Sequence, residues 1–146
     1  MSARAAALGV LKARLEGITL AHGYSSDAGK TLFIGENPKL GPDDVTASIG
    51  ISPLRDVVEY EGENITLTLP VLIQVIVGDK AETPWDTIEA AIADVKTAIE
   101  QDHDLDGTLI PRGLSRGMTE PVDRDLEFIG VTIEYRLTYK EGWGAP

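Results

Sequence analysis

The longest regular pattern in the chain lies in residues 65–77, which have the sequence ITLTLPVLIQVIV. Every second residue from Ile65 to Val77 is apolar, and in an extended chain these side chains lie on one face. A period of two held for thirteen residues predicts one long β-strand with a buried face. Pro70 has no backbone N–H to donate, so we expect it at a sheet edge or a β-bulge.

Three weaker patterns predict further strands. Residues 31–34 form a short apolar segment, and residues 45–51 alternate apolar side chains. The last predicted strand covers residues 126–139, where the apolar positions change from even to odd numbers at Gly130. Such a change of phase at a glycine predicts a β-bulge.

The remaining segments are interpreted from their charge and their glycine and proline content. Residues 52–64 are expected to form a loop or an irregular strand edge, and residues 105–114 a strand. Residues 111–125 are expected to form a long charged loop, and residues 140–146 a short tail after the last strand.

Two segments predict amphipathic helices. The first covers residues 3–16, with Ser2 as its N-cap and Gly17 at its C-terminal end. The second covers residues 84–101 and follows Thr83 as its N-cap. Its apolar stripe, in which the tryptophan is expected to be a core anchor, comprises Trp85, Ile88, Ile92, Val95 and Ile99. Its water-facing side is expected to comprise Asp86, Glu89, Asp94, Lys96 and Glu100.

These elements predict one α+β domain over residues 1–139, followed by the tail at 140–146. Two helices cannot cover both faces of such a sheet, so we expect both on one face of a mostly antiparallel sheet of four to five strands. The core is expected to comprise Leu8, Leu11, Leu15, Ile88, Ile92, Val95 and Ile99 from the helices, with Leu67, Leu69, Val71, Ile73, Ile133 and Tyr135 from the sheet.

Composition narrows the classes of function. The 146 residues include no cysteine, which excludes disulfides, thiolate metal sites and a thiol nucleophile. Thirteen basic and 24 acidic side chains give a net charge of −11, which is unfavourable for binding the phosphates of free duplex DNA. The same charge also keeps a chain soluble. No apolar run approaches the roughly 20 residues that span a bilayer, so no membrane contact is expected.

Two segments resemble known binding loops but lack an essential feature. Five residues separate Gly23 from the Gly29-Lys30-Thr31 sequence, whereas a phosphate loop needs four. Residues 102–107, DHDLDG, match the first half of a calcium loop, but the twelfth position is Gly113 instead of the bidentate glutamate. We expect an ordinary loop and a polar turn respectively. Weak cation binding is left open at Asp102, Asp104 and Asp106.

The chain holds two histidines, His22 and His103, and both are expected at the surface. No G-x-S-x-G turn presents a serine nucleophile, and no H-E-x-x-H spacing presents a zinc site. We therefore expect no catalytic residue, no metal-binding residue and no cofactor. The chain is expected not to be an enzyme.

A family resemblance covers most of the chain. Residues 15–29, LEGITLAHGYSSDAG, are similar to the opening of minor tail proteins, in which a helix leads into a glycine, an aliphatic residue and then a G-Y-x-x-D-x-G turn. A long strand, a helix opened by residues 83–85 (TPW) and a last strand closing at residues 139–143 (YKEGW) follow in the same order. The chain thus resembles the tail-terminator family of long-tailed bacteriophages, which includes the minor tail protein U of phage lambda.

The resemblance implies a structural virion protein located in the tail and assembled in the cytoplasm of the bacterial host. Tail-terminator subunits form a hexameric ring that caps the tail tube and joins it to the head-completion proteins. The implied partners are further copies of the chain, the tail tube protein and a neck protein. Six copies at −11 each would carry −66, so DNA could slide through the lumen without sequence-specific binding. The alternatives are another tail or neck subunit, and a small metal-binding or hydrolytic protein.

The sequence also predicts a surface for subunit contacts. Arg112, Arg116 and Arg124 lie in the predicted 111–125 loop of a strongly acidic chain, and Trp143 lies in the predicted tail. Arginine is enriched at interfaces because its planar fork pairs with carboxylates. We expect the loop to reach an acidic surface on a neighbouring subunit or on the tail tube, with the tryptophan as an apolar anchor. The alternative is a loop with solvated arginines.

Overall fold

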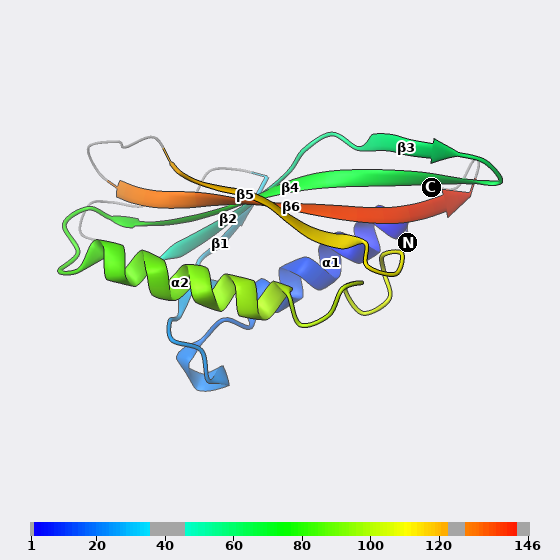
Figure 1. Cartoon of the computed structure of the whole chain (residues 1–146). Coiled ribbons are helices and arrows are strands. Elements are labelled where there is room, and N and C mark those ends of the chain that lie inside the picture. The colour runs from blue at the N-terminus through cyan, green and yellow to red at the C-terminus, as the bar shows by residue number, and fades with distance from the viewer. Residues whose placement is uncertain (1, 36–45, 123–127, 143–146) are drawn as a thin grey trace.

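A computed structural model describes residues 2–35, 46–122 and 128–142 (Figure 1). Within these residues, two α-helices pack on a six-stranded sheet, which confirms the α+β class. The helical elements are α1 (Ala3–Glu16), η1 (Leu20–His22), η2 (Ala28–Lys30) and α2 (Pro84–Ile99). The strands are β1 (Leu32–Ile34), β2 (Ser48–Pro53), β3 (Val57–Glu61), β4 (Asn64–Gly78), β5 (Leu114–Pro121) and β6 (Phe128–Gly142).

β4 and β6 form the centre of the sheet. All fifteen residues of β4 pair antiparallel with β6 in one unbroken register, from Asn64 opposite Gly142 to Gly78 opposite Phe128. The odd-numbered side chains of β4 from Leu67 onward are buried, as the period of two predicts. β6 continues three residues beyond the strand end expected at Tyr139.

Pro70 lies where β4 changes its neighbour. β2 pairs with residues 71–76 of β4. On the same side of β4, β3 pairs with residues 65–68. The Pro70 carbonyl accepts a hydrogen bond from the Leu54 N–H across this gap (2.8 Å). Because N and O of one strand residue point to the same side, the missing N–H of Pro70 also falls in the gap, where no ladder bond is lost.

The sheet order is β1-β2-β4-β6-β5, with β3 beside β4. β1 and β2 are parallel, and all the other pairs among the described strands are antiparallel. The sheet is therefore mixed, and it has six strands where four to five were expected. The difference arises because residues 57–61 and 114–121 form edge strands.

Both helices lie on one face of the sheet (Figure 1). Ser2 caps α1 by accepting a hydrogen bond from the Ala5 N–H (3.0 Å). At the start of α2 the Thr83 side chain makes no capping bond, and the Thr87 hydroxyl donates to the Thr83 carbonyl instead (3.1 Å). The residues expected in the core are buried, apart from Leu8, which is half-buried against it.

The strand predicted for residues 105–114 is wrong. Leu105, Asp106 and Gly107 have φ angles of 46°, 56° and 78°, which belong to tight turns and not to an extended strand. Leu105 and Leu109 are buried within these turns, which explains the apolar spacing. The next strand begins at Leu114, so the loop predicted for residues 111–125 is wrong for residues 114–121.

The β-bulge predicted at Gly130 is also wrong. Gly130 lies opposite Ile76 in an unbroken register, and Leu126, which contributed to the apparent phase change, lies outside the described residues. Glycine is required for space, because a Cβ at this position would overlap the Ile76 side chain and would lie 2.5 Å from the Val75 carbonyl oxygen. A large neighbour, not a shift of register, therefore accounts for the glycine.

The solvent exposure of two side chains of α2 differs from the prediction. Trp85, expected to be a core anchor, is 54% exposed. The first turn of α2 lies at the end of the sheet, where β4 ends at Gly78 and β6 begins at Phe128, so Trp85 sits at the margin of the core (Figure 1). Asp94, expected to face water, is buried because the loop after α1 packs against it.

Ile92→Ala tests the packing of α2 on the sheet. The Ile92 side chain is 7% exposed, so truncation removes buried methylene groups and leaves a cavity. We expect the free energy of unfolding, measured by urea denaturation, to fall by about 2–5 kcal/mol. Leu20→Ala, at a side chain that is 59% exposed, is the control and should change it by less than about 0.5 kcal/mol. Equal effects of the two substitutions would contradict this packing.

Candidate interaction surfaces

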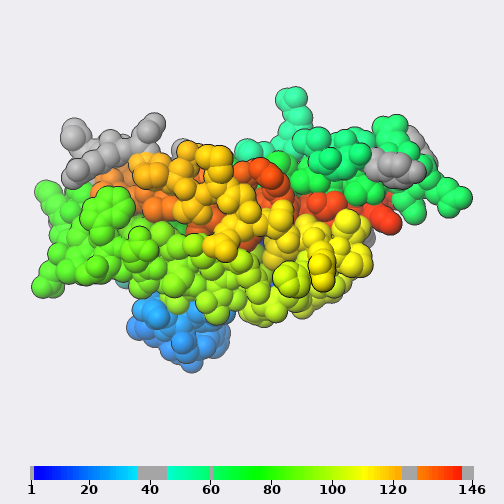
Figure 2. Space-filling model, viewed as in Figure 1, coloured from blue at the N-terminus to red at the C-terminus, as the bar shows by residue number. Residues whose placement is uncertain are grey.

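Residues 17–29, which lie within the 15–29 segment compared with minor tail proteins, form a loop that projects below the helices (blue in Figures 1 and 2). The Asp27 carboxylate closes the loop by accepting a hydrogen bond from the Leu20 N–H (2.8 Å). Gly23 has a φ of 88°, a conformation that glycine adopts without strain. The glycine and the aspartate of the sequence pattern therefore hold the shape of the loop.

The loop is fixed both to the end of α1 and to α2. The Gly29 N–H donates to the Ile18 carbonyl (2.9 Å), and a Cβ at Gly29 would overlap the backbone of the last turn of α1. Asp94 of α2 accepts hydrogen bonds from the Ser25 N–H (3.1 Å) and the Ser26 hydroxyl (2.6 Å). The buried carboxylate is thus satisfied by two donors of the loop.

An open cleft of about 410 Å³ lies between this loop and α2, with His22, Tyr24, Asp94 and Thr97 among its lining residues. The Ser26 hydroxyl donates its one proton to Asp94. His22 Nδ1 lies 3.0 Å from the Gly17 carbonyl, which can only accept, so Nδ1 carries the proton. These polar groups hold the loop in place. The sequence did not predict the burial of Asp94, because its partners lie about 70 positions earlier in the chain.

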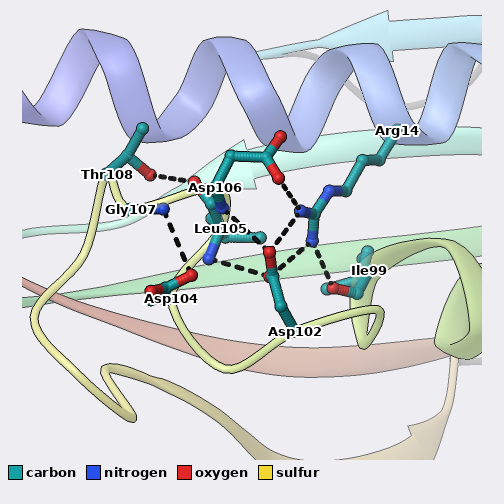
Figure 3. Close-up of polar contacts among 8 residues, drawn as sticks. All are labelled: Arg14, Ile99, Asp102, Asp104, Leu105, Asp106, Gly107 and Thr108. Atoms are coloured by element: carbon teal, nitrogen blue, oxygen red, sulfur yellow. Dashed lines mark hydrogen bonds and ion pairs between the residues drawn. The ribbon is translucent and has the colours of Figure 1, made fainter.

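Arg14 joins α1 to the turn after α2 (Figure 3). Its guanidinium donates to both carboxylate oxygens of Asp102, at 3.0 Å each, and to Asp106 at 3.0 Å. It also donates to the Ile99 carbonyl at the end of α2 (2.9 Å). The Arg14 side chain is 7% exposed, and a bidentate pair of this kind is a strong, directional contact.

Asp102 organises the turn that resembles half of a calcium loop. Its carboxylate accepts hydrogen bonds from the Leu105 N–H (3.0 Å) and the Asp106 N–H (3.1 Å). The hydrogen bonds from Arg14 lower the pKa of Asp102 to about 2. Acidic residues oppose the dipole at a helix C-terminus, and here the guanidinium supplies the compensating positive charge. The spacing of residues 102–107 could not show this, because Arg14 lies 88 positions away.

The structure places two of the four residues predicted to form an interface, since Arg124 and Trp143 lie outside the described residues. Arg112 is exposed in the turn before β5, with a φ of 57°. Arg116 lies on β5, where its Nε is 3.6 Å from Glu100 Oε1 and 43% of its side chain is exposed. Both described arginines therefore lie at the same margin of the sheet.

β5 is an edge strand. It pairs with β6 on one side, and no other strand of the described residues pairs with its second side. One extra residue bulges between Arg116 and Thr119, where Gly117 leaves room for the Glu134 side chain. Met118, beside the bulge, is 66% exposed. The edge thus presents arginines followed by an exposed methionine.

β3 forms a second edge, on the side of β4 away from β6 and β5. Its valines, Val57 and Val58, are each 50% exposed, and Leu54 just before them is 45% exposed. The strand and its turn also present three exposed carboxylates, Glu59, Glu61 and Glu63. The two adjacent valines are the sequence signal for this strand, but a bulge after Val58 interrupts the period of two.

No protein-family model matches the chain, and no curated protein matches it. Among the described residues, no group of three or more histidine, aspartate or glutamate side chains is arranged to hold a metal ion. Neither helix in this part of the chain is long and apolar enough to cross a bilayer.

Asp102→Asn tests the Arg14 contact through pH. The folded pKa of about 2 lies below the ordinary value of 3.8, so Asp102 contributes stability above pH 3.8 that is lost as the pH falls toward 2. Near neutral pH we expect the free energy of unfolding of the variant to be about 1–2 kcal/mol lower than that of the parent. Urea denaturation at a series of pH values should show this difference shrinking below about pH 4. A difference that stays constant to low pH would contradict the assignment.

Calcium titration tests the same turn. A calcium ion would have to displace the Arg14 guanidinium from Asp102 and Asp106, and it would find Gly113 where a bidentate glutamate is needed. We expect calorimetry to detect no affinity tighter than about 10⁻⁴ M. Micromolar binding that disappears in Asp102→Asn would overturn this expectation.

Proposed function

We propose that this chain is a tail-terminator subunit of a long-tailed bacteriophage. Copies of the chain would form a ring that caps the tail tube and joins it to the head-completion proteins. The observation that carries the proposal is the projecting loop of residues 17–29. The residues that resemble the tail-terminator family are the same residues that give this loop its shape.

The loop is suited to docking on another protein. Leu20 near its tip is 59% exposed, whereas Asp27 and Asp94 hold the base with hydrogen bonds. A loop that is already ordered loses little conformational entropy on binding. An exposed apolar side chain is stabilised when a partner removes it from water. These features support a contact with the tail tube or with a neck protein.

Two of the edge strands of the described sheet, β3 and β5, support self-association. β3 and β5 lie on opposite sides of the β4–β6 pair, and edge strands present backbone groups that can pair with another chain. A contact between two different surfaces of identical subunits generates a closed ring when the rotation between them is a fraction of a full turn. A ring is the form that the proposed role requires.

The charge of the chain suits a channel for DNA. A net charge of −11 on each copy weakens binding to phosphates, so a ring could surround DNA without holding it. The proposed role thus needs no nucleic-acid site and no catalytic group.

Light scattering and electron microscopy with tail tubes test the proposal. We expect a particle of about six times the 15.7 kDa mass of one chain, alone or after addition of purified tail tubes, and caps at tube ends. Leu20→Asp should weaken attachment to tubes without changing the mass of the free particle. A 15.7 kDa species that leaves the tube ends bare would contradict the proposal.

A further inference from the structure

We propose that neighbouring copies of this chain join edge to edge, with β5 of one copy lying antiparallel against β3 of the next. The inference rests on the proposed ring. It identifies the partner surface of Arg112 and Arg116 as the acidic β3 edge of an identical chain. Figure 2 shows β5 (yellow to orange) along the middle of the molecule and the β3 segment (teal to green) at the upper right.

The strand directions are compatible with this arrangement. β3, β4, β6 and β5 lie side by side in that order, and each neighbouring pair is antiparallel. β5 and β3 therefore run in opposite directions. A second copy, turned about an axis roughly parallel to the strands, brings its β3 beside β5 of the first. The alternation of strand direction then continues from one subunit to the next.

The two edge strands lie at different positions along the strand direction of the sheet. β3 pairs with residues 65–68 of β4, whereas β5 pairs with residues 131–137 of β6, which lie opposite residues 69–75 of β4. Joining β5 to the next β3 therefore shifts each copy along the strand direction. A constant shift of this kind tilts the strands of a closed sheet relative to its axis, so it is compatible with a ring.

The exposed side chains of the two edges are complementary in charge. Those at the β5 edge include Arg112, Arg116, Met118 and Glu120. Those at the β3 edge include Glu63, Glu61, Glu59, Val57 and Arg55. Arginine therefore predominates at the β5 edge and glutamate at the β3 edge, so pairing the two edges brings side chains of opposite charge together. Opposite charges across neighbouring strands stabilise their pairing.

The intramolecular contact of Arg116 leaves it able to bind a second carboxylate. Its Nε lies 3.6 Å from Glu100, and a guanidinium has five N–H donors, more than one carboxylate can use. Both edge strands carry a bulge, and bulges discourage indiscriminate pairing of sheet edges. The side chains are then the features that select the partner.

Pairing between like edges is less favourable because of their net charge. The β5 edge carries Arg112 and Arg116 against Glu120, a net positive charge. Two β3 strands would bring together the glutamates at positions 59, 61 and 63. Like charges on adjacent strands destabilise their pairing. Opposite charges meet when the contact is head to tail, and a repeated head-to-tail contact closes into a ring.

Charge reversal at each edge tests the inference. One variant combines Arg112→Glu with Arg116→Glu, and the other combines Glu59→Arg with Glu63→Arg. Each variant alone has two edges of the same sign, so we expect association at least about tenfold weaker than in the parent. An equimolar mixture of the two variants, or one chain with all four substitutions, restores opposite charges across every contact. Light scattering should then show the mass of the parent assembly again.

A matched control reverses two exposed lysines away from both edges. Lys12→Glu with Lys80→Glu makes the same change in net charge as the arginine variant and should assemble like the parent. Circular dichroism melting confirms that each variant is folded. If either edge variant assembles like the parent, or if the mixture stays dissociated, the edge pairing is wrong while the proposed ring stands. If the parent is monomeric with and without tail tubes, both proposals are wrong.

Discussion

The pairing of β4 with β6 is the contact on which the rest of the structure depends. Fifteen consecutive residue pairs hold the two strands in one register, and one face of both strands carries the centre of the core. The helices pack on that face, and β2, β3 and β5 pair along the outer sides of the two strands. A shift of one residue would turn the buried side chains of β4 to the other face, so the apolar alternation of residues 65–77 fixes the register.

The elements that sequence analysis located well are those in which the local pattern and the tertiary burial agree. α1 covers the predicted residues 3–16, and β4 extends one residue beyond the predicted strand at each end. β5 was missed because Leu114 is its one buried side chain, so an edge strand with open faces leaves little periodicity. The turns at residues 105–113 were mistaken for a strand because their buried leucines imitate alternation.

The polar contacts could not be derived from local spacing. Asp94 lies on a helix side that looks solvent-facing, and its burial depends on serines of the loop after α1. Asp102 and Asp106 resemble calcium ligands until Arg14 is placed between them. For the interface, the excess of acidic residues made Arg112 and Arg116 conspicuous. Their proposed partner surface could be identified only from the strand order, which places β3 at the opposite edge.

The projecting loop and the sheet edges are separate surfaces, and the proposed role as a tail-terminator subunit needs both kinds. We propose that contacts between copies use the edges, where charges of opposite sign lie on different margins of one sheet. In the same proposal, contacts with the tube or the neck use the loop, whose shape is held by internal hydrogen bonds. This division allows one surface to be altered while the other keeps its function.

Electron microscopy of the purified parent chain tests most directly the central claim, which is head-to-tail association through opposite sheet edges. The account predicts closed rings with one rotational axis, an axial channel, and density in which β5 of each subunit continues into β3 of the next. Particles with twofold symmetry joined through like edges, or single copies alone, would contradict it.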